Sequence, residues 1–153
     1  MEGLSLPFLL LVFLILGIDQ LSKYLIRTNF QLNESFPVIK SIFHLTYVHN
    51  PGAAFGLLAN KTPLFVGVTL IVIISIIFAY FRFEPDRLIL RLALALMLGG
   101  AVGNLIDRIL LGYVVDFLDF VFWPVFNLAD VAIVTGVTLL GWEILRPVSD
   151  RGD

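Results

Sequence analysis

The sequence contains no cysteine among its 153 residues and has few charged residues. Without cysteine the chain can form no disulfide framework, no thiolate metal site and no thiol nucleophile. Charged residues make up 14% of the chain and hydrophobic residues 59%. This composition supplies too few polar residues to cover the surface of a soluble domain of this length. The net charge is −2 and no basic run occurs, so nucleic acid is not an expected partner. We therefore expect an integral membrane protein.

The sequence contains several long runs of apolar residues. A bilayer core of about 30 Å is crossed by about 20 helical residues. Four segments satisfy this length: residues 6–25, 64–81, 88–106 and 126–145. The predicted fold is therefore an all-α membrane protein with four transmembrane helices, forming a single integral membrane domain over residues 1–153. The first run follows Glu2 rather than a basic segment, so we expect it to be a retained span and not a removed signal peptide.

The long first loop, residues 28–62, has a pattern of its own. Residues 42–49 are rich in β-branched and aromatic side chains and predict a strand. The turn Asn50-Pro51-Gly52 follows, and residues 53–60 are expected to form a short apolar segment at the membrane interface. A small extracytoplasmic β-sheet in this loop is the predicted result. Because His44 and His49 should lie on opposite faces of the strand, no metal site is expected there.

The orientation in the membrane depends on the basic residues. The ten lysines and arginines divide equally between the two sides, so their number alone decides nothing. Arg82, Arg87 and Arg91 surround a very short loop, and positive charge in short loops favours the cytoplasmic side. We therefore expect both termini to be cytoplasmic and the first loop to be extracytoplasmic.

Residues 99–130 concentrate polar groups between two apolar spans. They include four aspartates, two asparagines and one arginine: Asp107, Asp116, Asp119, Asp130, Asn104, Asn127 and Arg108. A charged side chain at the centre of a membrane helix costs about 2.5 to 3.5 kcal/mol on insertion scales, so it usually has a function. This stretch is therefore the expected active site.

Two of these aspartates are candidates for acid–base chemistry. Asp116 lies in an apolar run, and Trp123-Pro124 allows the chain to double back toward Asp130. Asn127 is a strong N-cap, and an acid in the first turn complements the helix dipole, so capping alone could explain Asn127 and competes as an explanation for Asp130. If both carboxylates share a water-poor site they cannot both ionise. They would then share a proton and supply one base and one acid.

Three further polar residues leave alternatives open. Asp19 and Lys23 stand one helical turn apart in the favourable order for an ion pair. They either pair near the headgroups or support a nearby active site. Asp107 ends the third span and is interpreted as the partner of Arg108 or as a group that anchors the backbone.

Five short blocks of the sequence form a recognisable series: DQLSK (residues 19–23), NPGAAF (50–55), GGAVGNLIDR (99–108), VVDF (114–117) and FNLAD (126–130). Each block is weakly specific alone, but their order and spacing cover nearly the whole chain. Together they resemble the lipoprotein signal peptidases (signal peptidase II), a family of aspartyl proteases of the bacterial cytoplasmic membrane.

The resemblance implies an enzyme that removes signal peptides from prolipoproteins, cutting before a cysteine that carries a diacylglyceryl group. Asp116 and Asp130 match the family's catalytic pair. The positions that match substrate-binding or pocket-shaping residues are Asn50, Gly52, Asn104, Arg108 and Asn127. Asp19 and Lys23 match site-supporting residues, and Asp107 is expected to support the site as well.

The resemblance also implies partners and a location. We expect diacylglyceryl-modified prolipoproteins and membrane lipid as partners, no cofactor or metal, and a monomeric chain. The location is the bacterial cytoplasmic (inner) membrane, with the active site near the outer face.

A different class of function remains as an alternative. A small proton- or ion-conducting membrane protein could use Asp19, Asp107, Asp116 and Asp130 as a relay. Such a relay should distribute carboxylates through the membrane depth. Here they gather near one face, and no buried carboxylate is expected on the side of the short basic loop. A purely structural membrane subunit is disfavoured by the same clustering.

Overall fold

The computed structural model describes residues 4–52, 61–83 and 88–146. Within them are four helices that are long and apolar enough to cross a membrane: α1 (Leu6–Asn29), α2 (Thr62–Phe83), α3 (Leu88–Leu111) and α4 (Leu128–Leu145). The predicted four-span fold is confirmed. The interfacial segment expected at residues 53–60 lies outside the described residues, as do residues 84–87 of the short basic loop.

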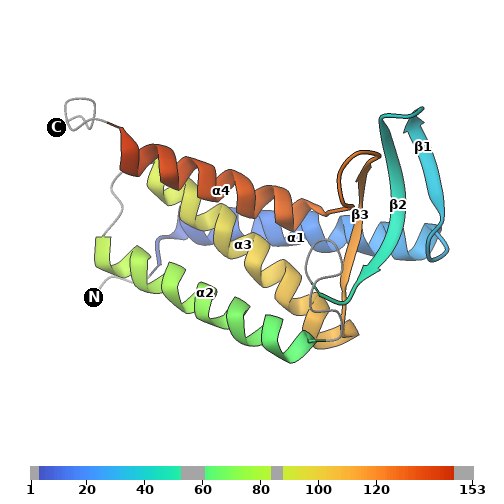
Figure 1. The fold of residues 1–153 in the computed structure, drawn as a ribbon. Coiled ribbons are helices and arrows are strands. Elements are labelled where there is room, and N and C mark those ends of the chain that lie inside the picture. Colours follow the sequence, from blue (N-terminus) through green and yellow to red (C-terminus); the bar gives the residue numbers. More distant parts are fainter. Residues whose placement is uncertain (1–3, 53–60, 84–87, 147–153) are drawn as a thin grey trace.

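The helices α1 and α3 continue four and five residues past the predicted ends of their spans, to Asn29 and Leu111. Apolar composition marks only the part of a helix that lies in the hydrocarbon core of the bilayer. The helical backbone hydrogen bonds continue through the polar residues that follow this part. This extension keeps Arg108 helical and carries the last turn of α1 toward the sheet (Figure 1).

The helix α3 lies at the centre of the bundle and packs against the other three helices (Figure 1). Small residues allow its close approach to α4. A Cβ atom on Gly100 would lie 2.5 Å from the carbonyl oxygen of Ala129, and one on Gly136 would lie 2.7 Å from that of Ala93. Only glycine fits at these two contacts, which is the usual device for tight helix packing in membranes.

A three-stranded antiparallel sheet crosses the end of the bundle (Figure 1). Its strands are β1 (Ser35–Ile39), β2 (Phe43–Asn50) and β3 (Val114–Phe120), in that order. The strand predicted at residues 42–49 is confirmed as β2. The sheet is not limited to the first loop, however, because β3 comes from the connection between α3 and α4. Its first four residues are buried, so it lacks the alternation that identifies a half-exposed strand.

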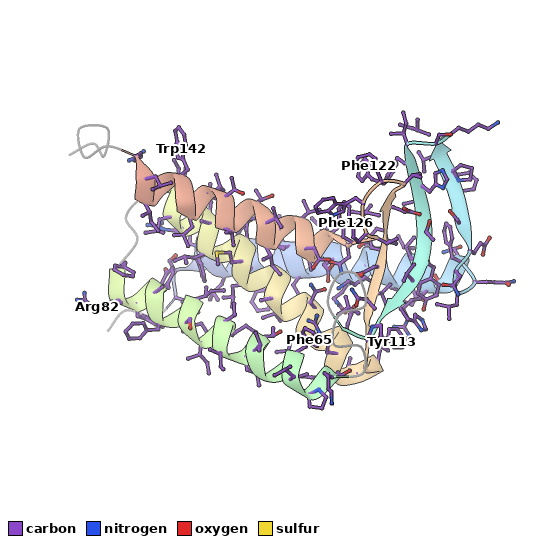
Figure 2. All side chains as sticks on the ribbon, viewed as in Figure 1. Phe65, Arg82, Tyr113, Phe122, Phe126 and Trp142 are labelled. Carbon is purple, nitrogen blue, oxygen red and sulfur yellow. The ribbon has the colours of Figure 1, made fainter. Side chains whose placement is uncertain are left out.

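Two apolar clusters flank a polar layer. One joins α1, α2 and α3 through Phe8, Val12, Ile76, Tyr80, Leu94, Ala95 and Leu98. The other lies beneath the sheet and contains Ile26, Tyr47, Val115 and Phe117. Along α1, the polar residues Asp19 and Lys23 fall between these clusters. The outer faces of the helices carry large exposed apolar side chains, as expected for contact with lipid (Figure 2).

Candidate active site

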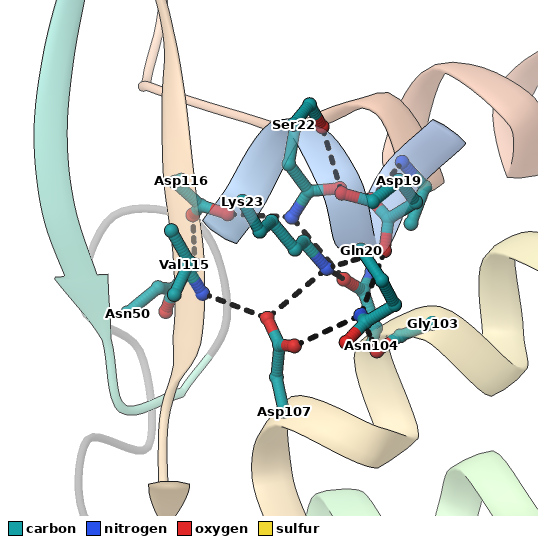
Figure 3. A network of polar contacts seen from close by, with 12 residues as sticks. Asp19, Gln20, Ser22, Lys23, Asn50, Gly103, Asn104, Asp107, Val115 and Asp116 are labelled. Carbon is teal, nitrogen blue, oxygen red and sulfur yellow. Dashed lines mark hydrogen bonds and ion pairs between the residues drawn. The ribbon is translucent and has the colours of Figure 1, made fainter. Parts of the chain in front are cut away.

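The polar layer is built where α1, α3 and the start of α4 meet strands β2 and β3 (Figure 3). Its buried charged and amide side chains belong to Asp19, Lys23, Asn104, Asp107, Asp116 and Asn127, each at most 5% exposed. Groups this deeply buried require hydrogen-bond partners, and each of these six has at least one.

Asp116 lies on β3 and is held by two amide groups. Its Oδ1 accepts a hydrogen bond of 2.7 Å from Asn127 Nδ2, and its Oδ2 accepts one of 2.8 Å from Asn50 Nδ2. Burial and the nearby charge of Asp130 raise the pKa of Asp116 from 3.8 to about 7, against the opposing effect of the two amides. Near neutral pH this carboxyl group can therefore carry or release a proton.

Asp130 lies in the first turn of α4 and is half-buried. Its Oδ1 accepts a hydrogen bond of 2.8 Å from Asn104 Nδ2, and its Oδ2 accepts one of 3.3 Å from the backbone N–H of Asn127. Asn127 Oδ1 in turn accepts from the backbone N–H of Asp130 at 2.9 Å, which completes a capping box. The capping interpretation of Asn127 is confirmed. It is not the whole role of this residue, since its Nδ2 also reaches Asp116.

The two aspartates are thus fixed by one set of amides. Asn127 contacts both of them directly, and its Nδ2 also donates to Asn104 Oδ1 at 3.1 Å. All four carboxylate oxygens accept an N–H hydrogen bond, so both carboxyl groups are oriented before any substrate binds. Paired carboxyl groups in which one is ionised and one protonated can activate a water and polarise a carbonyl.

Lys23 is the centre of a second set of contacts (Figure 3). Its Nζ lies 2.8 Å from Asp19 Oδ2 and 3.0 Å from Asp107 Oδ2, and it donates to Asn104 Oδ1 at 3.0 Å. The Lys23 and Asp19 side chains are only 3% and 0% exposed, so the pair is enclosed by the protein. The predicted ion pair between Asp19 and Lys23 is present, and it lies in the same polar layer as Asp116 and Asp130.

Asp107 anchors the strand that carries Asp116. Its Oδ2 accepts a hydrogen bond of 3.0 Å from the backbone N–H of Val115. Of the two interpretations from the sequence, backbone anchoring is the one observed. Its ionic partner is Lys23 rather than Arg108, because α1 places a cation closer than the next residue of the same helix can reach.

Asp19 anchors the helix that carries Asp130. Its Oδ1 accepts a hydrogen bond of 2.9 Å from the backbone N–H of Ala129. A Cβ atom on Gly103 would collide with Asp19 Oδ2, so glycine is required there for α1 to approach. The buried ions therefore fix the backbone on both sides of the aspartate pair.

Gln20 belongs to the same network and was not predicted from the sequence. Its Nε2 donates to Gly103 O at 3.2 Å, to Asp107 Oδ1 at 3.1 Å and to Asp19 Oδ2 at 3.2 Å. A polar residue beside Asp19 in an otherwise apolar helix was the available signal. Its role depends on α3, which no local pattern reveals.

The remaining candidate residues surround the pair. Asn50 Oδ1 accepts from the backbone N–H of the buried Gly52 at 3.0 Å, which turns the amide of Asn50 so that its Nδ2 faces Asp116. Arg108 is half-buried and within electrostatic reach of Asp116 and Asp130, and its guanidinium carbon lies 5.4 Å from the centre of the Phe65 ring.

Asp119 stands apart from this arrangement. It accepts a hydrogen bond of 2.6 Å from Thr46 Oγ1, which is itself bonded to Ser35 Oγ. Three residues along a strand place Asp119 on the face opposite that of Asp116. Within the described ranges, no group of three His, Cys, Asp or Glu side chains converges as a metal site would require.

The sequence predicted no buried carboxylate at the end of the bundle that carries the short basic loop, and this prediction was wrong. Glu143, in the last turn of α4, is only 5% exposed, and its Oε2 lies 3.4 Å from Arg146 Nε. A nearby cation compensates the buried carboxylate, which the apolar pattern of α4 did not indicate. Glu143 is separated from Asp130 by about 20 Å of helix without an ionisable residue, so the two do not form a relay.

The fold and the site define a multi-pass membrane protein with two aspartates held together at one end of its bundle. Residues 11–146 match the family described as signal peptidase (SPase) II. The chain is 70% identical to the lipoprotein signal peptidase of Moorella thermoacetica, over 95% of this chain and 97% of that protein. It is 50% identical to the lipoprotein signal peptidase of Pelotomaculum thermopropionicum, over 90% of each. The chain belongs to the signal peptidase II family and is a peptidase, of the aspartic type that is typical of that family.

Solved structures agree with this assignment. Two bacterial membrane enzyme structures, both obtained by the in meso method, have the same fold. One has a TM-score of 0.88 at 33% identity, over 99% of this chain and 95% of that one. The other has a TM-score of 0.84 at 33% identity, over 96% and 97%.

Proposed function

We propose that this enzyme removes the signal peptide from diacylglyceryl-modified prolipoproteins, cutting immediately before the lipidated cysteine. The substrate class follows from the activity named for its relatives. The observation that supports it most strongly is the aspartate pair, with Asp116 and Asp130 joined through Asn127 at the end of a membrane-spanning bundle.

In the proposed reaction the two aspartates have different roles. Asp130, the half-buried member of the pair, acts as the base and takes a proton from a water that attacks the scissile carbonyl. Asp116 is buried and protonated, donates a hydrogen bond to the carbonyl oxygen, and later protonates the leaving amine. The pKa of about 7 at Asp116, raised by burial and by the charge of Asp130, supports this division.

The other candidate residues position this pair or the substrate. Asn50, Asn104 and Asn127 orient the carboxyl groups through the hydrogen bonds described above. Gly52 fixes the amide of Asn50. Arg108 faces the pair with its guanidinium group and binds carbonyl oxygens of the substrate backbone.

The proposed orientation places the site at the outer face of the cytoplasmic membrane and both termini in the cytoplasm. The helix α1 begins, and α4 ends, at the bundle end opposite the sheet (Figure 1). Arg82 and Arg91 lie at that same end, in agreement with the positive-inside tendency. A reporter fused after Asp153 should be cytoplasmic and one inserted near Asn33 extracytoplasmic. The opposite pattern would refute this orientation.

The proposed function is tested by cleavage of a defined substrate. Purified enzyme in detergent is incubated with a diacylglyceryl-modified prolipoprotein and with its unmodified form, and release of the signal peptide is measured. We expect rapid cleavage of the modified form and much slower cleavage of the other. Equal rates would indicate a peptidase without lipid specificity. No cleavage of either form by folded enzyme would refute the proposed function.

A further inference from the structure

The guanidinium group of Arg108 has an unusual environment for a half-buried cation. Within residues 4–52, 61–83 and 88–146, it forms neither a hydrogen bond nor an ion pair. Its neighbour Asp107 is already committed to Lys23 and to the backbone of β3. Buried polar groups normally have partners, so the free N–H donors of Arg108 are available for a ligand.

The contact that the structure does give this group is the aromatic ring of Phe65. The guanidinium carbon lies 5.4 Å from the ring centre, within the range of a cation–π interaction. A ring attracts the cation without accepting a conventional hydrogen bond from it. A carboxylate at the same place would occupy the donors and neutralise the charge, whereas Phe65 leaves both intact.

The ring is held in place by the packing of α2 on α3. Thr62, at the start of α2, donates a hydrogen bond of 2.9 Å from its Oγ1 to the carbonyl oxygen of Gly112, just past the end of α3. Phe65 is one turn further along α2, and Arg108 is one turn back along α3. The two contacts therefore lie one helical turn apart along the antiparallel pair of helices α2 and α3.

We propose that Phe65 is a positioning residue for Arg108. Its ring holds the guanidinium group toward the aspartate pair while leaving the N–H donors free to bind carbonyl oxygens of the substrate. This inference rests on the proposed function, because it takes the ligand of Arg108 to be the bound prolipoprotein. It assigns a role in substrate binding to α2, which supplies none of the site residues predicted from the sequence.

The test uses substitutions that distinguish the effect of the aromatic π face of Phe65 from the effect of its apolar volume. Phe65→Leu keeps an apolar side chain but removes the π face, and Phe65→Tyr keeps the ring. We expect Phe65→Leu to lower kcat/KM by about three- to thirtyfold, mostly through KM, and Phe65→Tyr to stay close to the wild type. Phe78→Leu is the matched control, since Phe78 is in the same helix but 66% exposed on its outer surface. It should change neither parameter.

The same measurement in an Arg108→Gln background completes the cycle. If Phe65 acts through Arg108, Phe65→Leu should have little further effect there. Three results would overturn the proposal: a wild-type KM for Phe65→Leu, an equal loss for Phe65→Tyr, or a full additional loss in the Arg108→Gln background. A lower kcat at unchanged KM would also overturn it, because that result indicates a smaller active fraction. Failure of the wild-type enzyme to cleave would instead refute the proposed function.

Discussion

The polar layer contains two pairs of carboxyl groups with different surroundings. Asp19 and Asp107 lie within 3.0 Å of the ammonium group of Lys23. Asp116 and Asp130 are held by neutral amides and a backbone N–H. A cation at contact distance favours ionised carboxylates directly, whereas the neutral amide donors oppose the raised pKa of Asp116 only in part and leave the repulsion between the two carboxylates in place. The first pair is suited to holding the backbone and the second to exchanging protons.

The two pairs are connected by one side chain. Asn104 accepts from Lys23 through its Oδ1 and donates to Asp130 through its Nδ2. Because the ammonium group can only donate, it fixes which end of the amide faces the aspartate. The structural pair thereby determines the geometry of the reactive one.

The largest expected effect comes from removing either reactive carboxyl group. Asp116→Asn and Asp130→Asn should each lower the single-turnover rate by about a thousandfold or more, since asparagine can serve neither as base nor as acid. The double variant should be little worse than either single one, because both groups act in one step. Thermal unfolding in detergent checks that each variant is folded. A near-wild-type rate for either variant would contradict the assignment.

The structural pair should instead show its importance in stability. Lys23→Met leaves Asp19 and Asp107 buried without a cation, and should lower the free energy of unfolding by about 3 to 5 kcal/mol. Lys61→Met, at an exposed lysine, is the matched control and should have little effect. Unfolding followed by denaturant or heat measures both. Equal stability of the two variants would mean that the ion cluster is not the structural element described here.

A smaller effect on activity is expected from Asp107, which contacts the backbone of β3 but neither reactive aspartate. Asp107→Asn weakens the contacts to Lys23 and Val115 and should lower kcat/KM by about tenfold, as expected for the loss of a charged hydrogen bond. Asp119→Asn, on the same strand as Asp116 but bonded to Thr46, should retain most of the activity. If Asp119→Asn proved the more damaging, the separation between the two faces of β3 would be wrong.

The smallest effect is a pH-dependent difference in stability. The pKa of Asp116 is higher in the folded protein, at about 7, than its ordinary value of 3.8. Its protonated form is thus favoured by folding, and the associated stability, complete below pH 3.8, is lost as the pH rises through 7. Asp116→Asn lacks this loss, so its melting temperature relative to the wild type should increase by several degrees between pH 4 and pH 8. A constant difference would contradict the raised pKa.

Much of the site could be predicted because carboxylates are conspicuous in apolar sequence. Asp116, Asp130, Asn104 and Asn127 were singled out in the polar stretch in this way, and the resemblance to a family added Asn50 and Gly52. The sequence did not predict which of several nearby residues each polar side chain contacts in the folded protein. The preference of Asp107 for Lys23 over Arg108 depends on how α1 packs on α3.

The unpredicted elements have a common cause. The first four residues of β3 are all buried, and Phe65 lies in an apolar span, so neither differs from its local sequence background. Glu143 is compensated by Arg146 at the end of the helix, where the apolar pattern no longer indicates which side faces the core. For β3 and Phe65, packing against segments distant in the sequence rather than local composition decides the environment.

The shared proton of the aspartate pair is tested most directly by the pH dependence of kcat/KM, which reports groups of the free enzyme. It is measured with a diacylglyceryl-modified prolipoprotein between pH 4 and pH 9. We predict a bell-shaped profile in which activity falls at low pH as the base is protonated and falls at high pH with an apparent pKa of about 7, as Asp116 loses its proton. An activity that rises through pH 7 to a plateau would contradict a protonated Asp116 and the mechanism built on it.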